Sequence, residues 1–403
     1  MTSSLLVSDH RAGWWRSVST DCLLEPLPPA RPATLAEHAG VLRLPLGAPA
    51  RAVFADDARG ALVVVRGASS VEEIPLAIPA EHLACDGSGR HVVCTTGAGA
   101  SWEPWSDLVT IADLETGESL RCRVRVGEPG VAVVDGEEEH EPVVVLRHRQ
   151  PGAVETIGLA AIRAAGPHCP VVRGVSLALE GDLGHGDALD RKGGVLYCAT
   201  EAGLERVRIT GGGSLERLVT WPWPVEGRAY FLRLDPVRRE LVAALRGGPA
   251  GPTRWQHWRN HVATWRLDEE SVDVEATDDG LVFRPDVLDG HVAWTVVHPD
   301  GDRLHHRRPD GQTLSTELPA MSAAPRPGAT PWDAVDGRSA QRRALALLDG
   351  RRTAVTRGGD GELSIVEDGE ITTTVSLETP VDEGGHLTLL PGSPPELVDG
   401  IGR

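Results

Sequence analysis

Two loops of the sequence carry the same tryptophan pattern, W-x-x-W-x-(Asp/Asn)-x-Val. The first loop reads SWEPWSDLV and contains Trp102 and Trp105, and the second reads RWQHWRNHV and contains Trp255 and Trp258. Exposed tryptophan clusters are typical of surfaces that bind partners or ligands, because each indole offers a large contact area. The repeat therefore predicts that these four side chains flank one cavity. The alternative is that the indoles fill the core beneath the loops, which is common for tryptophan.

A second set of candidates lies at the starts of short apolar segments, namely His82, His185, Arg228 and His386. Three imidazoles close to one axis could bind a transition metal or act as acid–base groups, and Arg228 could hold an anion. A chain with 15 His is also expected to contain solvent-exposed or hydrogen-bonded histidines without such a role. We predict no cofactor, with a metal at the three histidines as the alternative.

Several catalytic motifs are missing from the sequence. There is no HExxH motif and no GxSxG elbow, and the single lysine, Lys192, is followed by two glycines, so it cannot belong to a Walker A loop. The glycine-rich segments at 97–101 and 210–214 lack the strand–helix setting of dinucleotide binding. Whether the protein is an enzyme therefore stays open at this stage.

The composition limits the class of protein. With 58 Asp and Glu against 40 Lys and Arg, the net charge of −18 argues against a nucleic-acid partner. No stretch approaches 18 apolar residues, so we expect no membrane partner, and the first residues lack the basic region of a signal peptide. The cysteines read as reduced core thiols, with Cys85 and Cys94 as the one possible disulfide pair. Lys and Asn are scarce, as expected for a GC-rich genome, because their codons are AT-rich. Together these features predict a cytoplasmic bacterial protein.

A repeating unit of about 45–50 residues determines the fold prediction. Each unit begins with a short apolar segment, a turn rich in Asp, Gly and Arg, and a more apolar segment, followed by one or two further strands. The clearest copies span 82–126 and 228–275, and weaker copies begin near 51, 131, 186, 281 and 332. One such four-stranded unit cannot bury both of its faces, whereas seven units arranged around an axis can. The period matches that of propeller blades.

The sequence thus resembles the seven-bladed β-propellers of the WD40-like and YVTN-like group. The resemblance rests on the period and on turns such as DLETGES at 113–119, and the Trp-Asp signature occurs only once, at Trp332 and Asp333. It implies an all-β fold of four-stranded antiparallel blades, with a pair of β-sandwiches as the alternative. We expect an N-terminal segment over 1–45 that supplies outer strands and a linker, the propeller over 46–392 and a tail over 393–403. Residues 4–8, 41–46 or 386–391 could close the ring.

The propeller topology places the candidates on one face. In this architecture the connections between blades share a face with the loops between the second and third strands, and the inner strands start there. Trp223 and Trp332 fall in connections between blades on that face, beside the two W-x-x-W loops. We therefore predict a propeller that binds a peptide, a protein partner or a small aromatic ligand at the tryptophan-rich mouth of its channel. The alternative is an enzyme of bacterial specialised metabolism whose site at the mouth is lined by His82, His185 and His386.

Overall fold

Short apolar strands joined by tight polar turns make each unit a meander of antiparallel strands. In the unit around residue 110, Val109, Ile111 and their neighbours pair in register with the strands on both sides. The turn after this strand is held by Asp113, whose Oδ1 accepts hydrogen bonds from the amides of Glu115 and Thr116. Gly117 closes the turn with a φ of +74°, which glycine adopts without strain.

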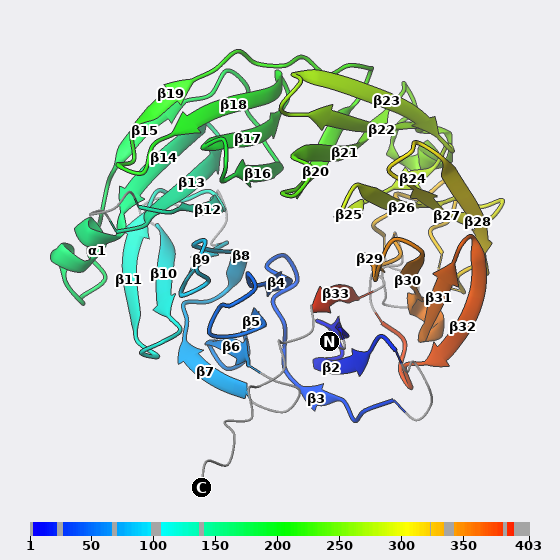
Figure 1. Ribbon diagram of the computed structural model, residues 1–403, viewed down its shortest axis with the longest axis horizontal. Helices are drawn as coiled ribbons and strands as arrows, with labels where there is room; N and C mark the ends of the chain where they lie inside the picture. Colours follow the sequence, from blue (N-terminus) through cyan, green and yellow to red (C-terminus); the bar gives the residue numbers. More distant parts are fainter. Residues whose placement is uncertain are drawn as a thin grey trace, which may run out of the picture.

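Eight such sheets are arranged in a ring around a central axis (Figure 1). The computed structural model describes residues 3–21, 27–66, 71–97, 106–136, 141–322, 324–333, 342–381 and 385–390. The fold is therefore an all-β propeller of four-stranded antiparallel blades, as predicted, but with eight blades in place of seven.

We number the blades along the chain. Blade one contains β1 (Ser4–Asp9), β2 (Trp14–Ser19), β3 (Arg31–Pro32) and β33 (His386–Leu390). Blade two contains β4 (Val41–Arg43), β5 (Ala52–Asp56), β6 (Ala61–Val65) and β7 (Val71–Pro75). Blade three contains β8 (Ala80–Cys85), β9 (His91–Thr96), β10 (Asp107–Asp113) and β11 (Ser119–Val124). Blade four contains β12 (Gly130–Val134), β13 (Val143–Arg149), β14 (Gly152–Gly158) and β15 (Val175–Ala178).

The second half of the ring repeats the same order. Blade five contains β16 (Gly186–Asp190), β17 (Val195–Thr200), β18 (Gly203–Ile209) and β19 (Leu215–Arg217). Blade six contains β20 (Arg228–Asp235), β21 (Glu240–Gly247), β22 (Arg259–Arg266) and β23 (Ser271–Thr277). In blade seven the inner edge is divided between β24 (Leu281–Val282) and β25 (Asp286–Leu288), which both pair with β26 (His291–Val297), followed by β27 (Asp302–Arg307) and β28 (Thr313–Leu318). Blade eight contains β29 (Leu345–Leu347), β30 (Arg352–Arg357), β31 (Glu362–Glu367) and β32 (Glu370–Ser376).

The extra blade is made from the two ends of the chain. The seven units found in the sequence correspond to blades two to eight, and blade one comes from β1, β2 and β3 together with β33. The strand β33 is the innermost strand of this blade and pairs antiparallel with β1, from Ser4 opposite Leu390 to Ser8 opposite His386. The prediction of seven blades was wrong because the strands of blade one are separated by more than 350 residues and form no local repeat.

The hydrophobic core lies between neighbouring blades. Val93 and Val109 of blade three, for example, pack in one cluster with Val131 and Val144 of blade four. Each sheet thus buries both of its faces against its two neighbours, which is what a single four-stranded sheet could not achieve alone.

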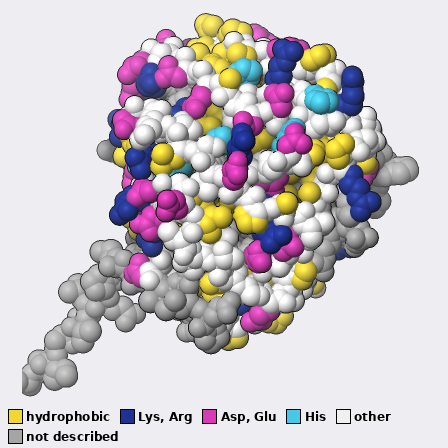
Figure 2. All heavy atoms as spheres, turned by 90° about the vertical axis from the view of Figure 1, so that its right-hand side faces the viewer, with side chains coloured by type: hydrophobic (Ala, Val, Ile, Leu, Met, Phe, Trp, Pro, Cys, Tyr) yellow, Lys and Arg dark blue, Asp and Glu magenta, His cyan; other side chains and the backbone are white. Residues whose placement is uncertain are grey.

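Helix is rare among the described residues. It is limited to α1 (Leu159–Ala165) and two short 3-10 segments, η1 (Pro252–His257) and η2 (Gly358–Asp360). None of the described helices has the length and apolar character needed to cross a membrane. The five described cysteines, Cys85 and Cys94 among them, are free thiols. On the outer wall shown in Figure 2, acidic and basic side chains are interspersed without a large patch of one sign.

Candidate functional site

The inner strands begin on one face of the ring, which we call the entrance face. In blade six, Arg228 at the start of β20 pairs with Arg246 near the end of β21, so both arginines lie at this face. His82 lies in the first half of β8, His185 directly precedes β16, and His386 begins β33. The structure therefore places all four residues of the second candidate set at the entrance ends of inner strands.

His82 and His185 are close enough to influence each other, whereas His386 belongs to another group. The pKa of His185 is lowered to about 4, first by partial burial and then by the charges of Arg149 and other neighbours that include His82. By its accessible surface the residue is nevertheless exposed. His386 instead faces His10, with ring centroids 6.1 Å apart, and burial lowers its pKa well below the usual value. Over the described ranges, no three His, Cys, Asp or Glu side chains are arranged to hold a metal ion.

The low pKa of His82 predicts a dependence of stability on pH. Burial is the main cause of its shift to about 4. The unfolded chain takes up a proton near pH 6.5, while the folded protein does so only near pH 4, so the free energy of unfolding falls as the pH falls through this window. For a partly buried group we expect a loss of about 1–2 kcal/mol between pH 7 and pH 5. Urea unfolding at both pH values should show a loss that is smaller in His82→Gln than in the parent by about this amount, because His185 and His386 contribute losses of their own. The exposed residue His257 provides a control, and His257→Gln should show the same loss as the parent. If His82→Gln also shows the full loss, the prediction is wrong.

Aromatic rings and guanidinium groups pack together beside these histidines. The rings of Phe231, in β20, and Phe283, which follows β24, have centroids 5.1 Å apart. The guanidinium carbon of Arg284 lies 4.2 Å from the centroid of Phe231, and that of Arg342 lies 5.0 Å from the centroid of Phe283. Such contacts bring the positive charge toward the electron-rich faces of the rings. They form a wall that is both apolar and cationic.

Arg246 is a half-buried guanidinium that contacts several of these rings. Its guanidinium carbon lies 4.1 Å from the ring centroid of Tyr230 and 5.6 Å from those of Trp258 and Phe283. Burial lowers its pKa, and the nearby charge of Arg228 acts in the same direction. Within the described part of the chain, no carboxylate forms an ion pair with Arg246 or Arg228. A partly desolvated cation without a counter-ion is unfavourable, so the site favours an anion that enters from outside.

A small cavity opens beside this cluster, between blades five and six. It has a volume of about 120 Å³ and is lined by residues that include Arg149, His185, Thr200, Arg228 and Tyr230. Both Nε and Nη2 of Arg228 donate to the Tyr230 hydroxyl, at 3.2 and 3.0 Å. Arg149 is already paired with a carboxylate, that of Glu128 at 2.8 Å.

Sequence reasoning found Arg228 and His185 but missed the aromatic wall. A signal was present in the composition, because the chain contains only 2 Tyr and 3 Phe. Three of these five, Tyr230, Phe231 and Phe283, meet at the entrance face. The other two, Phe54 and Tyr197, are buried in the core. In both RAYFLR and LVFRP a rare aromatic residue stands within two positions of an arginine on an inner strand or next to it.

The predicted tryptophans within the described ranges differ in burial and in their neighbours. Trp255 is 0% exposed and packs against Leu281 and Val297, so it belongs to the core, and we leave it out of the proposed site. Trp223 packs edge-on against Trp265, with centroids 6.2 Å apart, and donates its Nε1–H to the backbone oxygen of Thr200 behind the cavity.

The remaining tryptophans have different surroundings. Trp258 is half-buried, faces Arg246 and donates its Nε1–H to the backbone oxygen of Ala250 at 2.8 Å. Trp332 is 51% exposed in the connection before blade eight. Trp102 and Trp105 lie outside the described residues. Of the predicted tryptophans in the described ranges, only Trp258 contacts the cationic wall.

The polar residue of the W-x-x-W pattern has a structural role in both copies. Asp107 accepts hydrogen bonds from the amides of Gly127 and Glu128, at 2.7 and 3.0 Å. Asn260 donates to the carbonyl oxygens of Asp278 and Gly280, at 2.9 and 3.0 Å. In each case the side chain at the start of a third strand fixes the connection to the next blade. This shared task explains why Asp or Asn recurs at the same position of the pattern.

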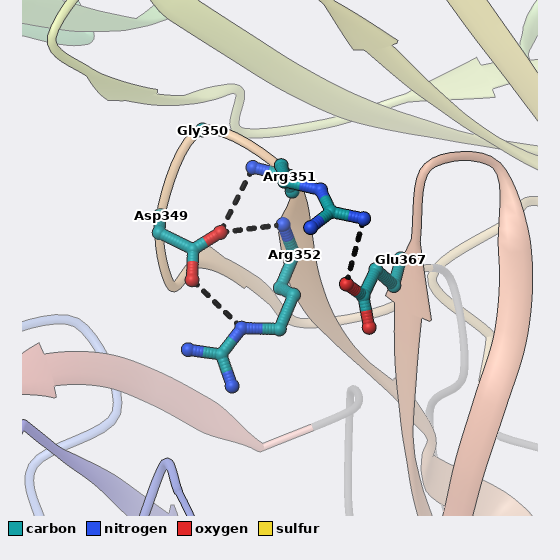
Figure 3. Close-up of a pocket in the computed structure, with 5 residues that line it drawn as sticks. All are labelled: Asp349, Gly350, Arg351, Arg352 and Glu367. Atoms are coloured by element: carbon teal, nitrogen blue, oxygen red, sulfur yellow. Dashed lines mark hydrogen bonds and ion pairs between the residues drawn. The ribbon is translucent and has the colours of Figure 1, made fainter.

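A larger hollow of about 260 Å³ lies at the hairpin between β29 and β30 (Figure 3). Its charges neutralise one another. Asp349 accepts from the backbone amides of Arg351 and Arg352 and from the Arg352 guanidinium at 2.7 Å, while Arg351 pairs with Glu367 at 3.1 Å. These pairs leave no excess charge to recognise a ligand, so the candidate site remains the cavity and wall at the entrance face.

Comparison with known proteins supports the fold alone. No family model matches the sequence, and no curated protein matches it. Among solved structures, apo AztD from Citrobacter koseri is similar, with a TM-score of 0.63 and 14% identity over 98% of this chain and 100% of that chain. The dihydro-heme d1 dehydrogenase NirN, solved in complex with DHE, is similar with a TM-score of 0.61 and 13% identity over 96% of this chain and 74% of that chain. This chain therefore shares the propeller fold of AztD and NirN.

Proposed function

We propose that this protein binds a small, flat, negatively charged organic molecule at the entrance-face mouth of its channel. The observation that carries the proposal is Arg246, a desolvated guanidinium held among aromatic rings with no ion-pair partner in the described part of the chain. A flat ring could extend the stack of Phe231 and Phe283, and its negative charge would offset the charge of Arg246.

Two further observations support a small ligand over a large partner. At the mouth, Arg246 and Arg228 have no carboxylate partner within the described residues, while the whole chain carries a net charge of −18, which would repel a large acidic partner. The similar propeller NirN was solved in complex with DHE, so the fold is compatible with a bound small molecule. The enzyme alternative, with His82, His185 and His386 as acid–base groups, stays a prediction.

The proposal is tested with two probes that share one flat ring. We expect 1-pyrenebutyrate to bind saturably and about tenfold more tightly than the neutral 1-pyrenebutanol, as followed by pyrene fluorescence anisotropy. In Arg246→Met the acid should bind about tenfold more weakly, because a charge-assisted contact is lost, and the alcohol should be little affected. Protoporphyrin IX, a larger flat acid, probes how wide a ring the mouth accepts.

Arg266→Met provides the matched control, since Arg266 lies in β22 of the same blade but pairs on the outer wall with Asp273 and other acidic residues. This variant should bind both pyrene probes like the parent. Equal binding of acid and alcohol, or acid binding that survives Arg246→Met unchanged, would contradict the proposal. So would the absence of saturable binding of both 1-pyrenebutyrate and protoporphyrin IX up to millimolar concentration.

A further inference from the structure

The cavity between blades five and six differs from the aromatic wall in its chemistry. The wall offers ring faces and guanidinium planes, whereas the cavity offers hydrogen-bond donors in a space of about 120 Å³. A space of this size suits a single acid group and not a ring system. The two features share Tyr230, whose ring contacts Arg246 and whose hydroxyl group bonds to Arg228.

The Tyr230 hydroxyl can donate a hydrogen bond to a ligand. Its oxygen already accepts two N–H groups from Arg228, at 3.2 and 3.0 Å, so both lone pairs are engaged. The structure gives this hydroxyl no acceptor for its own proton within the described ranges. The proton is therefore available to an oxygen atom of a ligand.

Arg228 also favours a negatively charged ligand in the cavity. Tyr230 engages only two of the five N–H groups of its guanidinium, and in the described part of the chain no carboxylate pairs with it. The planar donor fork of arginine matches the two oxygens of a carboxylate. Arg149, across the cavity, adds positive charge to the surroundings, but its ion pair with Glu128 reduces its own need for an anion.

From this arrangement we propose that the cavity is a carboxylate subsite, in which Arg228 and the Tyr230 hydroxyl bind the acid group while the ring of the ligand lies against Phe231 and Phe283. The inference rests on the proposed function and makes it more specific. The ligand class becomes a flat carboxylic acid whose carboxylate is on a short flexible arm, since the cavity lies beside the wall and not within it.

The test uses Tyr230→Phe, which removes only the hydroxyl group and keeps the ring against Arg246. We expect this variant to bind 1-pyrenebutyrate about tenfold more weakly and 1-pyrenebutanol as before. Arg228→Gln should weaken acid binding by a similar factor. The double variant should lose less than the product of the two single effects, because Arg228 positions the phenol oxygen that Tyr230 uses.

The two proposals fail in different ways. If Tyr230→Phe changes the binding of acid and alcohol equally, or changes neither, while Arg246→Met still weakens only the acid, the mouth binds anions but the cavity is not the subsite. If Arg246→Met is also without a selective effect, the proposed function itself is wrong. A pyrene sulfonate that binds like the carboxylate and shows the same dependence on Tyr230 would overturn the carboxylate assignment.

Discussion

A chain shortened to end at Gly385 is expected to lose its cooperative thermal unfolding transition, because it lacks the innermost strand of blade one. In the intact protein β33 pairs with β1 over five residues, and Leu390 is fully buried. Leu387 and Leu389 are partly buried against the neighbouring core. Burial of three such side chains contributes about 5 kcal/mol, which is comparable to the total stability of many domains.

The matched control is a chain that ends at Leu390 and so retains β33. Circular dichroism melts should give a cooperative transition for this control and a broad or strongly lowered one for the shorter chain. Hydrogen exchange should show loss of protection in β1, whose edge is left unpaired. Equal melting temperatures for the two chains would mean that the ring does not depend on β33 for its closure.

Replacement of Arg343 by Met is expected to reduce the free energy of unfolding by about 3–5 kcal/mol, because it leaves the buried carboxylate of Asp302 without its partner. The Nε of Arg343 donates to Asp302 Oδ2 at 2.7 Å, and its Nη1 donates to the backbone oxygen of Thr356 at 3.1 Å. The two side chains are 1% and 3% exposed. This pair joins the start of β27 to the segment before β29 and so connects blades seven and eight.

Two further variants distinguish this effect from a general loss of charge. Arg351→Met removes an ion pair of a side chain that is 66% exposed, and we expect a much smaller loss of stability because solvent screens this pair. The double variant Arg343→Met with Asp302→Leu should recover a large part of the loss, since neither charge is then buried alone. Urea unfolding gives the free energy of unfolding of Arg343→Met, of Arg351→Met and of the double variant. If the double variant is as unstable as Arg343→Met alone, the hydrogen bonds of Arg343 to the backbone matter more than its ion pair.

The proposed anion site is compatible with the acidic net charge of the chain. At physiological ionic strength, charges on the outer wall are screened beyond about 8 Å. The guanidinium groups of the mouth act over shorter distances and are partly removed from water. We therefore expect binding at the proposed site to depend on Arg246 and Arg228 and much less on the net charge of the chain.

The sequence by itself determined the blade architecture. Alternating apolar residues and turns such as the one at Asp113 are local signals, so the four-stranded unit and its repetition could be predicted without long-range information. The same local signals located the starts of the inner strands. For this reason His82, His185, Arg228 and His386 were correctly placed at one end of their strands.

Only the tertiary structure decided the number of blades and the composition of the mouth. Blade one depends on the pairing of Ser4–Asp9 with His386–Leu390, and no repeat within the sequence indicates this pairing. Whether a loop tryptophan is core or surface depends on what the next blade places against it, as the burial of Trp255 shows. The aromatic wall joins Phe231 of blade six to Phe283 of blade seven, and the cavity adds side chains of blades four and five. Such a site results from the packing of neighbouring blades, and packing partners are set by the closed ring and not by the local sequence.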